Sequence, residues 1–108
     1  MLFRSEFLHA DDLARACVFL MQHYREEQFI NVGFGSDVSI KELAGLVKKC
    51  VGFAGDTVWD TTRPDGTPRK LMDSSGILAL GWRPQIDLEQ GIRRAYEDFL
   101  ASFAASAD

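Results

Sequence analysis

The sequence predicts a mostly helical α/β unit, an α+β-like arrangement of about four helices with two or three short strands. Apolar residues recur at three- and four-residue steps in four segments, a spacing that gathers them on one face of a helix. Short runs rich in β-branched and aromatic residues lie between these segments. The 108 residues can bury one core but not two, so we expect a single domain spanning residues 1–108.

The composition excludes several classes of protein. With 46% hydrophobic and 26% charged residues, the chain is expected to fold. The net charge of -4 and the pI near 5.1 argue against a nucleic-acid partner, because binding phosphates requires a basic surface. No apolar run approaches the roughly 20 residues that span a bilayer, and the N-terminus lacks the order of a secretory signal. We therefore expect no membrane partner and a cytoplasmic location.

The first helix is predicted over residues 11–25, with Asp11 and Asp12 supplying the N-cap. A short extended segment at 7–9 precedes it. A strand at 29–32 is expected to follow, closed by the Gly-Phe-Gly turn at 33–35. The residues expected on the buried face of the helix are Leu13, Ala16, Cys17, Leu20, Met21 and Tyr24.

The second helix has the clearest start in the chain. Ser39 and Glu42 have the spacing of a capping box, and Gly52 suits a left-handed C-terminal cap. A further strand is predicted at 57–60. The expected buried stripe of this helix is Ile40, Leu43, Leu46, Val47, Cys50 and Val51.

Two further helices are expected towards the C-terminus. Asp73 can cap a short helix that runs to Leu80 and stops at Gly81, and Asp87 can cap the last helix with Gln90 three residues on. The expected buried face of the last helix is Leu88, Ile92, Ala95, Tyr96, Phe99, Leu100 and Phe103.

The loop at 61–70 is the segment whose composition points most directly to a binding site. Arg63, Arg69 and Lys70 lie around Asp65, which is the centre of a Pro-Asp-Gly turn. Such a turn can present cations and backbone amides to a phosphate-bearing ligand, and the carboxylate can accept hydrogen bonds from hydroxyls or a base edge. On composition alone, a solvated turn with surface charges is the favoured interpretation.

Other candidate sites are weaker. The Gly-Phe-Gly turn at 33–35 lacks the third glycine of a dinucleotide fingerprint, because Val38 takes its place. His9 is expected to be structural, and Trp59 and Trp82 are expected in the core. Cys17 and Cys50 stand apart with no Cys/His cluster, so no metal site is predicted. The chain has no Tyr four residues before a Lys, no HExxH, no P-loop and no GxSxG, so no catalytic residues are predicted.

Several runs resemble extended short-chain dehydrogenase/reductases that act on nucleotide sugars. EFLHADDLA at 6–14, FINVG at 29–33 and SIKELA at 39–44 are similar to segments shared widely in that family. RPDGTPRKLMD at 63–73, followed by ALGW at 79–82, is similar to the KPDGTPRKLLD and ALGW signature of the GDP-L-fucose synthase branch. The resemblance extends from about residue 6 to residue 100 and concerns the C-terminal part of that family.

The resemblance implies a function that needs more than this chain. Enzymes of the branch convert GDP-4-keto-6-deoxy-D-mannose to GDP-L-fucose by 3,5-epimerisation and NADPH-dependent reduction. Their N-terminal Rossmann domain holds NADP and the Ser/Tyr/Lys catalytic set, and a smaller C-terminal domain closes over the GDP-sugar. We therefore expect the GDP-sugar-binding portion alone, a truncated product that is inactive by itself and binds no NADP alone. By motif, Asp65 and Lys70 would contact the GDP-sugar, with Arg69 a weaker candidate.

Two residues depart from the family pattern. Ser5 stands where these enzymes commonly carry an Arg that contacts substrate, with Arg4 one place earlier. Gly76 interrupts the short helix. Two alternatives stay open: a non-catalytic module that docks onto a separate Rossmann chain or self-associates, and a fragment of another nucleotide-sugar epimerase or dehydratase.

Overall fold

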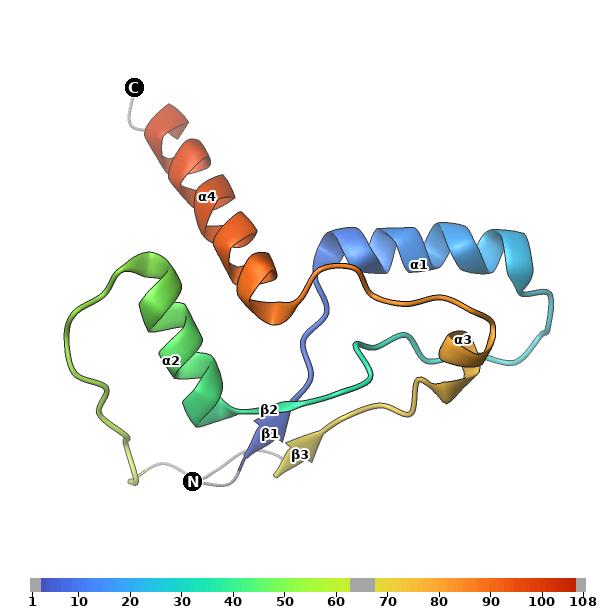
Figure 1. Cartoon of the computed structure of the whole chain (residues 1–108), viewed down its shortest axis with the longest axis horizontal. Helices are drawn as coiled ribbons and strands as arrows, with labels where there is room; N and C mark the ends of the chain where they lie inside the picture. The colour runs from blue at the N-terminus through green and yellow to red at the C-terminus, as the bar shows by residue number, and fades with distance from the viewer. Residues whose placement is uncertain (1–2, 63–67, 107–108) are drawn as a thin grey trace.

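The computed structural model describes residues 3–62 and 68–106, which form four helices and one small sheet (Figure 1). This confirms the predicted fold class. The helices are α1 (Ala10–His23), α2 (Ile40–Val51), α3 (Ser75–Ala79) and α4 (Leu88–Ser106). The strands are β1 (Arg4–Ser5), β2 (Val38–Ser39) and β3 (Arg69–Lys70).

The three strands bring distant parts of the chain together. Their order is β2-β1-β3, with β1 antiparallel to β2 and parallel to β3. The register places Arg4 opposite Arg69 and Ser5 opposite Lys70. Residues directly opposite one another on neighbouring strands share a face of the sheet, and successive residues alternate between faces. Arg4 and Arg69 therefore lie on one face, and Ser5 and Lys70 lie on the other.

The best-buried core lies between α1 and the segment that contains α3. Ala16, Ile77 and Trp82 form it, and Trp82 is only 6% exposed, which confirms its predicted core position. Figure 1 shows α1 and α3 on the same side of the molecule. The partly buried residues packed against this core are Leu8, Phe19, Leu20, Ile30, Val32 and Leu78.

The helix boundaries follow the capping residues. Ser39 Oγ accepts a 3.0 Å hydrogen bond from the Glu42 nitrogen, and α2 ends at Gly52, whose φ of 73° is left-handed. Asp87 Oδ1 accepts from the Gln90 nitrogen at 2.8 Å where α4 begins. These three predicted caps are confirmed.

Two caps differ from prediction. The N-cap of α1 is His9, whose Nδ1 accepts a 3.0 Å hydrogen bond from the Asp11 nitrogen, so neither Asp11 nor Asp12 fills that role. Ser74 occupies the N-cap position of α3. Asp73, the predicted cap, still accepts the Ser75 nitrogen at 3.0 Å.

Two predicted strands do not form. Residues 29–32 and 57–60 have no strand pairing, and Phe29 and Val58 are 88% and 87% exposed. Segment 7–9 is likewise unpaired, and the strand lies at β1 instead. Trp59, predicted in the core, is 37% exposed. An extended segment becomes a strand only where another strand lies beside it, and these segments have no such neighbour among the described residues.

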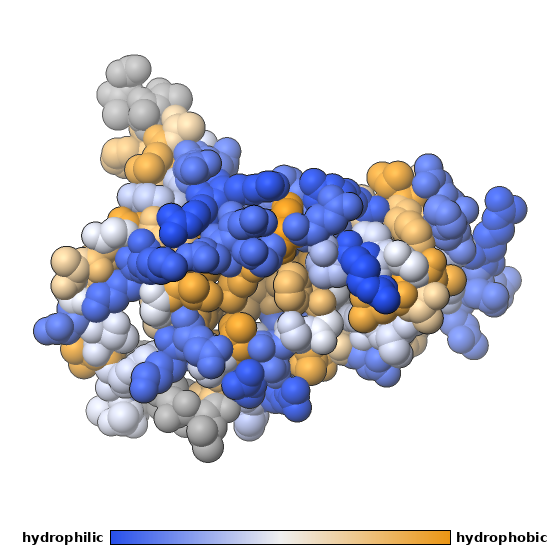
Figure 2. All heavy atoms as spheres, viewed as in Figure 1, coloured by the Kyte–Doolittle hydropathy of each residue, from blue (hydrophilic) through white to orange (hydrophobic). Residues whose placement is uncertain are grey.

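The arrangement of the helices is open. The radius of gyration is 16.9 Å, against about 13 Å for a compact domain of 100 residues. Helix α2 packs on α4, but the far end of α4 projects away from the rest (Figure 1). Several residues predicted to be buried are therefore exposed: Leu13, Cys17, Met21, Val47, Ala95, Phe99, Leu100 and Phe103. Figure 2 shows hydrophobic residues reaching the surface between polar patches.

Candidate functional site at the sheet edge

Strand β3 carries two of the three predicted binding residues. Backbone hydrogen bonds from the Arg4 nitrogen to the Pro68 oxygen (3.0 Å) and from the Glu6 nitrogen to the Lys70 oxygen (2.9 Å) hold this strand against β1. Arg69 and Lys70 are both exposed, and they lie on opposite faces of the sheet. The third predicted residue, Asp65, lies outside the described residues, as does Arg63.

Arg69 is held by a carboxylate that the sequence analysis did not single out. Asp37 Oδ2 lies 2.6 Å from Arg69 Nε, and Asp37 Oδ1 lies 3.0 Å from Arg4 Nε. The Asp37 side chain is 6% exposed. The hydrogen bond from Arg69, together with that from Arg4, lowers the pKa of Asp37 below its usual value, against the opposing effect of burial. The carboxylate is therefore ionised at neutral pH and is shared by two guanidinium groups.

Lys70 lies on the other face, opposite Ser5. Among residues 3–62 and 68–106, its ammonium group has no ion-pair partner. An ammonium group exposed on an ordered strand can meet the charge of a phosphate. Arg4 does not substitute for an arginine at position 5, because its side chain lies on the opposite face and binds Asp37.

The Gly-Phe-Gly turn at 33–35 does not fit a dinucleotide. Glu6 Oε2 accepts a hydrogen bond from the Gly35 nitrogen at 3.3 Å, and Glu6 Oε1 accepts one from the Met72 nitrogen at 2.9 Å. A Cβ added at Gly33 would lie 2.6 Å from Glu6 Oε1, so the carboxylate occupies the space beside the turn. A pyrophosphate placed there would meet a negative charge and an amide that is already bonded.

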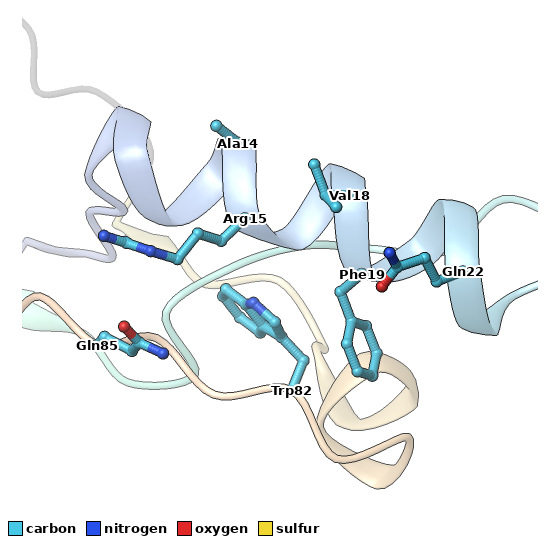
Figure 3. A pocket seen from close by; sticks show the side chains of 7 residues that line it. All are labelled: Ala14, Arg15, Val18, Phe19, Gln22, Trp82 and Gln85. Atoms are coloured by element: carbon cyan, nitrogen blue, oxygen red, sulfur yellow. The ribbon is translucent and has the colours of Figure 1, made fainter.

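A hollow lies beneath α1 (Figure 3). The indole of Trp82 forms its floor, with Arg15 and Phe19 on either side. The one charged group of its lining, Arg15, binds the buried Asp12 at 3.0 Å. The hollow therefore offers mainly apolar contacts and no arrangement of groups for acid-base or nucleophilic chemistry.

Within the described ranges, no three His, Cys, Asp or Glu side chains gather closely enough to hold a metal ion. The two cysteines are free thiols. None of the helices in the described part of the chain has both the length and the apolar character needed to cross a membrane.

No protein-family model matches the chain. Individual proteins do match the chain by sequence. GDP-L-fucose synthase 1 of Arabidopsis thaliana is 55% identical over 95 residues, which cover 88% of this chain and 29% of the relative. By sequence, the chain is homologous to the C-terminal part of GDP-L-fucose synthases. It spans less than a third of the length of the curated relatives that it matches.

Solved structures agree with the homology to GDP-L-fucose synthases. A GDP-L-fucose synthetase from Naegleria fowleri bound to NADP superposes with a TM-score of 0.88 at 26% identity, covering 95% of this chain and 33% of that one. A GDP-6-OMe-4-keto-L-xylo-heptose reductase from C. jejuni gives a TM-score of 0.84 at 43% identity, covering 93% of this chain and 32% of that one. The fold of this chain therefore recurs as one part of larger GDP-sugar enzymes.

Proposed function

We propose that the chain is the GDP-sugar-binding portion of a GDP-L-fucose synthase. The observation that supports this most strongly is the 55% identity to the Arabidopsis enzyme across 88% of the chain. In the complete enzyme, the substrate would be GDP-4-keto-6-deoxy-D-mannose. Its C3 and C5 flank the C4 ketone, so their protons are acidic enough for epimerisation through an enolate before the ketone is reduced. The catalytic groups and NADP would belong to the rest of the enzyme.

The contribution of this chain would be to hold the GDP-sugar in place. Lys70 offers its charge to the diphosphate, and Asp65 would accept hydrogen bonds from polar groups of the nucleotide or sugar. Arg69 contributes less, because its Nε is already bound to Asp37. Fixing a substrate relative to catalytic groups lowers the entropic part of the barrier, so a chain without catalytic residues can still contribute to the rate.

The exposed apolar surface supports a second contact, with the remainder of the enzyme. An apolar groove along α2 is lined by Leu43, Val47, Val51 and Phe53, and the outer part of α4 exposes Phe99 and Phe103. Isolated proteins rarely leave such surface in water. We propose that this surface packs against the cofactor-binding part of the synthase, and that the assembled enzyme works in the cytoplasm.

Calorimetric titration of the 108-residue chain with GDP tests the binding proposal. We expect binding that weakens at least about tenfold in Lys70→Gln, because a charge-assisted hydrogen bond to phosphate is lost. Arg94→Gln is the matched control, since Arg94 is an exposed cation on α4, away from the sheet. Equal affinity in all three proteins, or no binding by a chain whose circular dichroism shows it folded, would contradict the proposal.

A further inference from the structure

We propose that Asp37 is a positioning residue for GDP-sugar binding: by bridging Arg4 and Arg69, its carboxylate holds β3 on β1 and so fixes Lys70 beside Ser5. The inference rests on the proposed function, because it assigns Lys70 to the diphosphate. It adds a residue outside the loop at 61–70 to the binding machinery.

The need for Asp37 follows from the register of the sheet. Arg4 and Arg69 are directly opposite each other on parallel strands, so their side chains share one face. Two like charges in that position repel and destabilise the strand pair. Asp37 reduces this repulsion, because each of its carboxylate oxygens accepts a hydrogen bond from one of the two guanidinium groups.

Among the described residues, few other contacts hold β3 on β1: the backbone hydrogen bonds to Pro68 and Lys70, and the one from the Met72 nitrogen to Glu6 Oε1. Each strand is two residues long, so the ladder between β1 and β3 contains few backbone hydrogen bonds. Asp37 directly precedes β2, and its carboxylate reaches across to β1 and β3, so one side chain joins all three strands. The Asp37 side chain is only 6% exposed, whereas the Arg4 and Arg69 side chains are 43% and 62% exposed, so water partly screens both ion pairs and the contact acts mainly through its position between the strands.

The same contact separates the roles of two adjacent cations. Arg69 is held on the Asp37 face by its bond to the carboxylate, and this leaves Lys70 on the opposite face. If β3 detached from β1, both side chains would lose their fixed orientation. The effect of Asp37 on ligand binding is therefore transmitted through the position of Lys70.

The test compares Asp37→Asn, which keeps the shape but removes the charge, with Asp37→Glu, which keeps the charge. Asp56→Asn is the matched control at an exposed position. We expect Asp37→Asn to weaken GDP binding about tenfold, Asp37→Glu to recover most of that loss, and the control to bind as the original chain does. In a Lys70→Gln background, Asp37→Asn should change GDP affinity by less than about twofold, because the residue through which it acts is gone.

Amide hydrogen exchange reports the strand contact without any ligand. In Asp37→Asn the Glu6 amide, which donates to the Lys70 oxygen, should exchange faster, while the Leu13 amide of α1 should be unchanged. A loss of affinity equally large in the Lys70→Gln background would overturn the inference, as would unchanged affinity in Asp37→Asn. If the original chain is folded and binds no GDP, the proposed function fails together with the positioning role. The exchange data then still show whether Asp37 holds β3.

Discussion

The Asp12 carboxylate accepts a 2.9 Å hydrogen bond from the backbone nitrogen of Ile86, a residue 74 positions later in the chain. It also accepts the Gln85 nitrogen and Arg15 Nη1, each at 3.0 Å. Burial of Asp12 opposes ionisation, but these hydrogen bonds and the charge of Arg15 outweigh it and lower the pKa. Asp12 therefore ties α1 to the segment that leads into α4.

Removing the Asp12 carboxylate, which accepts these hydrogen bonds, should destabilise the chain. Asp12→Ala leaves two backbone N–H groups without an acceptor, and we expect it to lower the free energy of unfolding by about 2–4 kcal/mol. Urea denaturation followed by circular dichroism measures the effect. Asp11→Ala is the control, since the Asp11 side chain is 63% exposed, and it should cost less than about 1 kcal/mol. Equal effects of the two substitutions would argue against a structural role for Asp12.

The chain should lose stability in acid. Folding lowers the pKa of Asp12, Asp37, Asp73 and Glu89. A lowered folded-state pKa contributes stability that is fully present above the ordinary values of 3.8 for Asp and 4.5 for Glu, and is lost as the pH falls through the folded-state pKa. Unfolding free energies measured from about pH 6 down to about pH 3 should therefore decrease. Asp12→Asn should show a shallower decrease, and an unchanged slope would count against this assignment.

Gly45 within α2 and Gly52 at its C-cap should respond in opposite ways to alanine. A Cβ at Gly45 meets nothing within 4 Å, so Gly45→Ala should stabilise the chain by about 0.5–1 kcal/mol. Gly52 has a φ of 73°, and Gly52→Ala should cost about 1 kcal/mol because of strain in the left-handed conformation. Thermal denaturation of both variants checks the signs. Stabilisation by Gly52→Ala would mean that α2 does not end in the left-handed cap.

The exposed aromatic residues of α4 should drive self-association of the isolated chain. Phe99 and Phe103 stack with ring centroids 5.9 Å apart and are 59% and 63% exposed. We expect Phe103→Ser to reduce association in sedimentation velocity while changing the free energy of unfolding of the monomer by less than about 0.5 kcal/mol. Ile77→Ala, at a fully buried position, should cost about 2–5 kcal/mol and leave association unchanged. Phe103→Ser associating like the original chain would contradict the prediction.

The accuracy of the sequence predictions depended on how local each signal was. The start and end of α2 could be predicted because Ser39 and Gly52 act locally: Ser39 Oγ accepts the Glu42 nitrogen, and the left-handed Gly52 ends the helix. The predictions of strands at 29–32 and 57–60 were wrong, because a strand forms only beside another strand that can be distant in the chain, and composition does not reveal such a partner. The single-domain assignment stays a prediction.

For the candidate site too, the sequence showed which residues carry charge but not which distant residues they contact. The charges of Arg69 and Lys70 pointed to a binding segment, and the structure places both on an exposed strand. Their different surroundings depend on Asp37, which lies 32 residues before Arg69 and has no sequence signal that pairs it with Arg4 or Arg69. Likewise, Asp12 carries the features of a helix cap in the sequence, and only the fold brings it to Ile86.

The most direct test of GDP-sugar binding is an amide NMR titration of the 108-residue chain with GDP-mannose. We expect well-dispersed spectra in which the resonances that move cluster at Lys70, at Ser5 on the neighbouring strand, and in the loop at 61–70, while those of α1 stay in place. Dispersed spectra in which no resonance moves, or in which the shifts lie at the hollow beneath α1 instead, would contradict this expectation.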